Sequence, residues 1–340
     1  RLVAVEGVRL GSRGDEAVRV RRRRAAAAAA AEASAWRARL HALLLGEGLA
    51  LRYRSMRVLD LTMSGRLERE TVVMIEPHSA ILLDVAYDGQ DFSGYAFQPR
   101  QTTVAGTLLK AIREVDPTVD ELRAASRTDS GVHAHGQRVA FDVTRDIDCR
   151  GWVLGIQRGL PRSIGIRAAT LMVRGYNPRF DTALKRYRYW LLRDRVHDPL
   201  LAGRVWRIGD LHTDDRVELL RREWAALAGT HDFSAFASSR DKRQNTERSM
   251  VALDVQRHGD RLALDVTGDG FLHNMVRIMV GTAVDVGRGR LAPGAVERAL
   301  SSRLRKDAGM TAPPQGLHLE EVFLKTSPGP RWPALPECVS

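Results

Sequence analysis

Side chains able to do acid, base or nucleophilic chemistry are concentrated in residues 125–136, which read Ala-Ser-Arg-Thr-Asp-Ser-Gly-Val-His-Ala-His-Gly. Asp129 follows Arg127 by two residues, between two apolar, strand-like runs. Turn-forming residues between strands indicate a loop, and loops carried by a rigid sheet often display reactive groups. A guanidinium favours the ionised form of a nearby carboxylate, which can then act as nucleophile or base. Asp129 is therefore the leading catalytic candidate; an aspartate that only caps a turn is the alternative.

Residues 127–134 closely resemble the active-site signature of the tRNA pseudouridine synthases of the TruA type. Ser130 stands where alanine is usual and Ser126 where glycine is usual, and neither change touches the acid. Further matches occur in the family's order and span roughly residues 80–325, so the first seventy-odd residues are not covered. These matches are residues 86–89, 91–94, 179–180, 185–189, 231–233, 271–277 and 316–317.

The resemblance implies a role for three side chains. Asp129 matches the catalytic aspartate of the family, and Arg277 matches the arginine that pairs with it. Tyr187 matches the tyrosine that packs against the target uracil and assists removal of its proton. Strand alternation places Tyr187 and Tyr189 on one face, and Tyr189 fits the role of a core residue better. Whether the acid attacks the base or the sugar, or acts as a base, stays open.

The signature also supplies candidates for substrate binding. Arg127 is expected to contact RNA, by stacking or through a phosphate, and Thr128 and His133 complete the set. A solvated loop arginine is the alternative for Arg127. His133 and His135 form a His-x-His pair, but no Cys or Glu cluster near them completes a metal site. We therefore expect no metal.

The activity that the resemblance implies is isomerisation of uridine to pseudouridine in the anticodon stem-loop of tRNA, around positions 38 to 40, by a homodimer without a cofactor. The alternative is a non-catalytic RNA-binding protein with two RNA-recognition-like sheets. Such modules display closely spaced aromatic residues on their central strands, a pattern that we do not find here. A zinc-dependent nucleobase deaminase would need His-x-Glu and Cys-x-x-Cys, and the sequence has neither.

Hydrophobic periodicity predicts an α/β (α+β) fold in which the order β-α-β-β-α-β occurs twice. Two such units predict two ferredoxin-like or RNA-recognition-like sheets, with a cleft between the halves for a bulky ligand. The first unit comprises residues 80–87, 104–115, 122–126, 138–143, 152–160 and 164–173. The second comprises residues 186–192, 214–228, 250–256, 261–267, 272–286 and 317–324.

The ends of the chain differ in composition from this repeated pattern. We expect residues 1–73, with four consecutive arginines and seven consecutive alanines, to be a mobile extension, with a natural start at Met74 as another interpretation. The predicted halves are residues 80–180 and 185–326, followed by a proline-rich tail, 327–340. The net charge of +12 favours a polyanionic partner. Two cysteines and no long apolar run indicate a cytoplasmic protein without a membrane span.

Overall fold

The computed structural model describes residues 78–194, 196, 198–211, 213–241, 243–326 and 331–332. The expected N-terminal extension, 1–73, and most of the proline-rich tail lie outside the described residues. Within the described part, no helix is both long and apolar enough to cross a bilayer.

The first half of the fold is a β-α-β-β-α-β unit. Its strands lie in the order β4-β1-β3, with the short strand β2 paired to β3. Thr103 begins the first helix by accepting a hydrogen bond from the Gly106 amide, and Asp148 does the same for the second helix through Gly151. The elements are β1 (His78–Tyr87), α2 (Val104–Val115), β2 (Arg123–Ala124), β3 (His133–Asp142), α3 (Cys149–Arg158) and β4 (Ile164–Val173).

The second half repeats this order, with its main strands arranged β10-β5-β9-β8. Its elements are β5 (Thr182–Leu192), α5 (Asp214–Ala225), β8 (Glu247–His258), β9 (Arg261–Gly268), α6 (Met275–Gly287) and β10 (Leu317–Leu324). Smaller elements connect or extend the unit: α4 (Pro178–Asp181), β6 (Trp206–Arg207), β7 (Gly229–Asp232), α7 (Ala295–Ser302) and β11 (Arg331–Trp332). Both halves therefore have the strand order of a ferredoxin-like unit.

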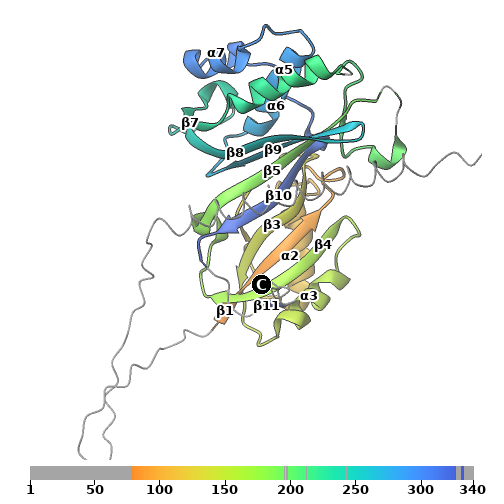
Figure 1. Cartoon of the computed structure of the whole chain (residues 1–340). Coiled ribbons are helices and arrows are strands. Elements are labelled where there is room, and N and C mark those ends of the chain that lie inside the picture. Colours follow the sequence, from red (N-terminus) through yellow and green to blue (C-terminus); the bar gives the residue numbers. More distant parts are fainter. Residues whose placement is uncertain are drawn as a thin grey trace, which may run out of the picture. The chain divides into compact units, whose positions relative to one another are not determined.

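The predicted α/β class with two β-α-β-β-α-β halves is confirmed, but the halves share one continuous sheet where the sequence predicted two. Strand β10 of the second half pairs in parallel with β3 of the first, through His318 with His133 and Leu319 with Ala134. The result is an 11-stranded sheet in which β11-β4-β1-β3-β10-β5-β9-β8-β7 follow one another (Figure 1). We call the β3–β10 pair the seam.

The helices and one face of the sheet enclose the main core. Leu108 of α2, Trp152 of α3, Trp224 of α5 and Met279 of α6 belong to one buried cluster. Strand residues on the same face, among them Tyr189, complete it. Burial of this apolar surface is the main stabilising contribution to the fold, and it fixes which strand residues face the helices. On β5 these include Tyr187 and Tyr189, as alternation predicts.

Candidate active site

The loop that carries Asp129 connects β2 to β3 and is held from two sides. Its own backbone closes a turn, because the Val132 amide donates to the Asp129 carbonyl at 3.2 Å. The segment after β1 packs against it, with the Tyr95 amide donating to the Thr128 carbonyl at 3.0 Å. A Cβ on Gly89 would lie 2.0 Å from the Val132 carbonyl oxygen, so only glycine permits this approach. The motif at residues 86–89 therefore helps to position the acid.

The Asp129 carboxylate lies between two side chains of the second half of the fold. Nη1 of Arg277 is 3.2 Å from Oδ2, and Nε2 of His273 is 3.5 Å from Oδ1. The Asp129 side chain is 24% exposed, so it is open to a ligand while its charge is paired. The pairing of Asp129 with Arg277 crosses 148 positions of sequence and joins the two halves at the acid.

Arg277 is held in place at the start of α6. Its Nε donates to the Ala312 carbonyl at 2.7 Å, and its Nη1 donates to Oδ1 of Asn274 at 2.9 Å. Asn274 itself has a left-handed backbone, φ 61°, which asparagine tolerates better than most residues. A guanidinium with these fixed contacts costs little further entropy when it pairs with the carboxylate. Arg277 is thus an ordered partner for Asp129.

Tyr187 lies next to the Asp129 loop and is almost fully buried, at 6% exposure. Its hydroxyl contacts the Ser126 hydroxyl at 2.9 Å, and its ring meets the edge of Phe271 at a centroid distance of 5.0 Å. Burial raises the pKa of Tyr187 to about 12; the Ser126 hydrogen bond acts against this and the charge of Asp129 adds to it. Tyr187 is therefore a neutral phenol at physiological pH.

Asp129 and Tyr187 line a pocket of about 1300 Å³ to which both halves contribute. Arg127 and Thr128 from the first half and His273 from the second also line it. The volume exceeds that of a site for one small molecule. Basic side chains outnumber acidic ones along the wall: Arg113, Arg123, Arg127, Arg179, Lys185, Arg243, Arg248 and Lys325, against Asp120, Glu121, Asp129, Glu247 and Asp269. Such a wall suits an extended polyanion.

The remaining predicted residues fall in different places. Arg127 is exposed in the pocket, and no carboxylate of the described chain forms an ion pair with it. Thr128 is buried, with its hydroxyl 2.7 Å from that of Tyr87. His133 is 3% exposed and does not line the pocket; its Nδ1 accepts from the Gly89 amide, and its Nε2 is 2.9 Å from the Gly203 carbonyl. The structure thus brings Arg127 and Thr128 to the pocket but places His133 at the seam.

Sequence reasoning gave no role to two residues that touch the central groups. His273 belongs to the matched run 271–277, and nothing else in the sequence indicated a role for it. Ser126 was noted only as a departure from the usual glycine, yet its hydroxyl contacts Tyr187. Among the described residues, no group of three or more His, Cys, Asp or Glu side chains is placed to hold a metal ion.

Comparison with known proteins agrees with this geometry. A family model described as tRNA pseudouridine synthase matches residues 224–323. The tRNA pseudouridine synthase A of Geobacter sulfurreducens is 40% identical over 247 residues, which cover 71% of this chain and 98% of that protein. The Bacillus subtilis protein of the same name is 35% identical over 242 residues, covering 70% of this chain and 96% of that protein. The chain therefore belongs to the tRNA pseudouridine synthase A family.

Proposed function

We propose that this enzyme isomerises uridine to pseudouridine in the anticodon stem-loop of tRNA, at positions 38 to 40. The chain is a tRNA pseudouridine synthase, as are its relatives by name, and the stem-loop is the finer part of the proposal. The observation that carries it is the Asp129 carboxylate, paired with Arg277 in a basic pocket that is large enough for an RNA segment.

The reaction breaks the bond between ribose C1′ and uracil N1 and forms a bond between C1′ and C5. The proton on C5 leaves and N1 gains one, so atoms and electrons balance without an oxidant or reductant. Asp129 supplies the carboxylate, which can attack the base, attack the sugar or take the proton. Before the reaction, Arg277 balances the negative charge of this carboxylate, with its Nη1 3.2 Å from Oδ2.

The other side chains of the pocket hold the nucleotide. Tyr187 and Phe271 present an aromatic surface beside Asp129 on which a uracil can pack. Arg127 is exposed on the same loop and is placed to stack on a base or to contact a phosphate. Thr128 supports the loop through its bond to Tyr87. A homodimer, which the family resemblance implies, and a cytoplasmic location, which the two cysteines favour, belong to the same proposal.

The direct test is pseudouridine formation on unmodified tRNA transcripts by the intact protein and by Asp129→Asn. We expect the variant to lose at least about a hundredfold in turnover, the size of effect of a positioned acid or base, and to keep its affinity for tRNA. Glu247→Gln is the matched control, because Glu247 also lines the pocket and the substitution removes the same charge. It should stay active.

Two outcomes would contradict the proposal. If neither protein forms product while both bind tRNA, the chain is an RNA-binding protein in which Asp129 is structural. If Asp129→Asn turns over like the intact protein, the carboxylate has no chemical role. Product mapped outside positions 38 to 40 would overturn only the stem-loop assignment.

A further inference from the structure

Four basic side chains gather on one part of the pocket wall, and we call them the cation cluster. Arg179 is on α4, Lys185 on β5, Arg248 on β8, and Arg243 on the segment that precedes β8. All four line the pocket. They come from two short stretches of chain, residues 179–185 and 243–248, which the fold brings together.

The cluster has few negative partners. Arg243 pairs with Asp241 at 2.5 Å. For Arg179, Lys185 and Arg248, the described part of the chain supplies no carboxylate within ion-pair distance. Nζ of Lys185 instead donates to the Ala125 carbonyl at 2.8 Å.

The arginines on the opposite face of β5, in contrast to Lys185, have carboxylate partners. Arg186 and Arg188 alternate with Lys185 and Tyr187 along β5. Arg186 pairs with Glu321 at 3.0 Å, and Arg188 pairs with Asp265 at 2.7 Å. The strand thus has carboxylate partners for its arginines on one face, whereas its lysine meets only like charges on the face that lines the pocket.

The electrostatics of the cluster point to an anionic ligand. Burial, together with the charges of Arg179, Arg243 and Arg248, lowers the pKa of Lys185 to about 8. Burial also lowers the pKa of Arg248, and Arg243 adds to that effect, against the charges of Asp269 and Asp241. Lys185 and Arg248 are half-buried, whereas Arg179 and Arg243 are exposed. Cations that repel one another cost free energy, which an anion bound between them would offset.

The position of the cluster identifies the anion. Lys185 and Tyr187 are two residues apart on the same face of β5, about 7 Å along the strand. Lys185 contacts Ala125 and Tyr187 contacts Ser126, so both side chains lie beside the start of the loop that carries Asp129. A group bound by Lys185 therefore lies about one two-residue strand repeat from a uracil that packs on Tyr187, close enough to belong to the backbone of the same RNA strand.

We propose that the cation cluster is a binding site for one backbone phosphate of the RNA, next to the nucleotide whose base enters the pocket. The site rests on the proposed function, because the ligand is the substrate of that reaction. The phosphate supplies the negative charge that the cluster lacks, and it fixes the register of the strand relative to Asp129.

Single neutral linkages in the RNA test the site. Methylphosphonate replaces one phosphodiester at a time in an anticodon stem-loop RNA, and the affinity of each RNA is measured for the intact protein and for Arg248→Gln. We expect one linkage beside the target uridine to weaken binding by the intact protein about tenfold and to have little effect on the variant. The slope of log affinity against log salt should fall by about one in Arg248→Gln.

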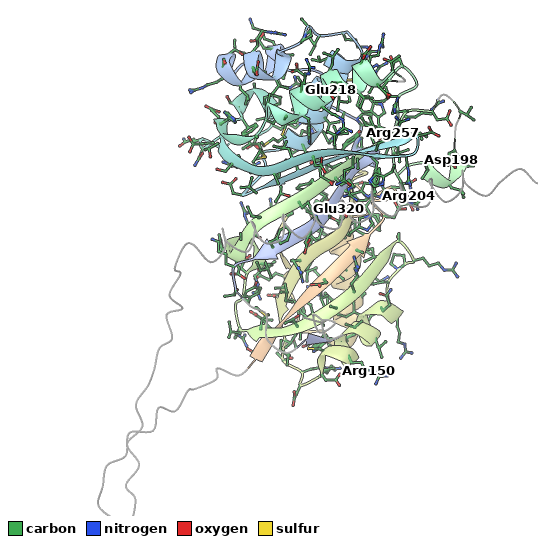
Figure 2. All side chains as sticks on the ribbon, in the orientation of Figure 1. Arg150, Asp198, Arg204, Glu218, Arg257 and Glu320 are labelled. Carbon is green, nitrogen blue, oxygen red and sulfur yellow. The ribbon has the colours of Figure 1, made fainter. Side chains whose placement is uncertain are left out.

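Matched variants separate this site from general charge. Arg257→Gln removes an exposed arginine from the same strand, outside the pocket lining (Figure 2). The affinity of Arg257→Gln should be weakened by the same methylphosphonate linkage as that of the intact protein. Arg179→Gln should lose sensitivity at the same linkage as Arg248→Gln, which guards against a local misfolding of β8.

Different outcomes would contradict the phosphate site and the proposed reaction. If no linkage is selectively sensitive in the intact protein, or if Arg248→Gln and Arg179→Gln keep the same sensitive linkage, the cluster does not bind a phosphate. Pseudouridine formation by the intact protein would then leave the proposed function standing. Failure of the intact protein to form pseudouridine would overturn the function itself, whatever the linkage profile.

Discussion

The hydroxyl of Tyr187 is buried beside the Asp129 loop, 2.9 Å from the hydroxyl of Ser126. Because burial raises its pKa to about 12, the phenol keeps its proton at neutral pH and is not a ready base in the free enzyme. Under the proposed function, the role of Tyr187 is to hold the uracil and to offer its neutral hydroxyl for a hydrogen bond, and the contact with Ser126 orients that hydroxyl.

This orientation predicts the effect of Ser126→Ala. The variant loses the hydroxyl that contacts Tyr187 but keeps the backbone, whose amide donates to Oε1 of Gln137. A hydrogen bond of this kind contributes about 1 kcal/mol, so we expect turnover to fall several-fold to about tenfold, with tRNA affinity unchanged. Single-turnover rates of Ser126→Ala, Tyr187→Phe and the double variant measure the coupling, and the two losses should not add.

Tyr189→Phe is the control for this pair. Its hydroxyl is also buried and donates to the Pro313 carbonyl at 2.6 Å, away from the pocket. This variant should lose stability without losing turnover. Additive losses for Ser126→Ala and Tyr187→Phe would show that the two hydroxyls act independently.

At the scale of residues, the sequence identified candidates that lie in matched motifs but not the residues that only contact them. Asp129, Arg277 and Tyr187 could be picked out because each lies in a matched motif, and the structure brings all three to one place. Ser126 could not, since a serine in a loop carries no sign of its distant partner. His133 belongs to the same signature as Asp129, yet it faces the seam because β3 already begins at that residue.

The seam is the element-level feature on which the shared sheet depends. Only two residue pairs join β3 to β10, and the buried His318 belongs to one of them. Its ring stacks on His133 and His135 at centroid distances of 4.6 and 5.5 Å, and its Nε2 is 3.1 Å from the carbonyl of Arg204. Arg204 belongs to the segment between β5 and β6 and is labelled in Figure 2.

Stacked, buried histidines make the seam sensitive to acid. Burial, together with the neighbouring His133 and His135, lowers the pKa of His318 to about 3, against the carbonyl of Arg204 and the charge of Asp88. In the unfolded chain the pKa is about 6.5. Between these values the unfolded state binds one more proton, so the free energy of unfolding falls as the pH falls from about 6.5 towards 3.

We therefore expect His318→Phe to flatten the pH dependence of stability. The substitution keeps an aromatic ring and removes the proton site, so the slope between pH 6 and pH 4 should drop by up to about 1.4 kcal/mol per pH unit. Urea unfolding at several pH values measures it. The exposed His258 provides the control, as His258→Phe should leave the slope unchanged. An equal slope in His318→Phe and the intact protein would contradict the prediction.

At the scale of elements, local sequence patterns predicted the bounds of helices and strands, whereas features that depend on long-range strand pairing were not predicted. The bounds of α2, β4 and β10 match the predicted ranges because each has clear periodicity. Strand β3 begins at His133 and not at Arg138, since residues 133–137 are polar or small and are paired by neighbours distant in sequence. Strand β2 has only two residues, because the chain leaves the sheet at Ala125 to form the Asp129 loop.

The joining of two repeated units into one sheet is a property of the whole molecule that no single repeat encodes. Each unit has its own β-α-β-β-α-β pattern, and the contact that unites them is a pair of short segments far apart in sequence. Uniting the sheets brings α6 against the Asp129 loop, which places Arg277 and His273 at the acid. The active site thus depends on an arrangement that the sequence predicted only as two halves and a cleft.

How much of the chain the reaction needs is also a question at the scale of the whole molecule. Every described residue that lines the pocket lies within Tyr95–Lys325. The Geobacter sulfurreducens relative is covered over 98% of its length by 71% of this chain. Residues 1–73 contain 15 arginines and 8 acidic residues, and this excess of positive charge can strengthen binding to any polyanion.

Deleting residues 1–73 should therefore weaken binding to RNA without slowing the chemical step. We expect single-turnover pseudouridine formation at saturating tRNA to stay within about twofold of the intact chain, because every pocket residue that the structure describes is retained. Binding to unrelated RNA at low salt should weaken, with a shallower dependence on salt concentration, because the loss of net positive charge reduces counterion release. A fall of more than about tenfold in the saturated rate would show that this segment contributes to the active site, and an unchanged salt dependence would show that its arginines do not contact RNA.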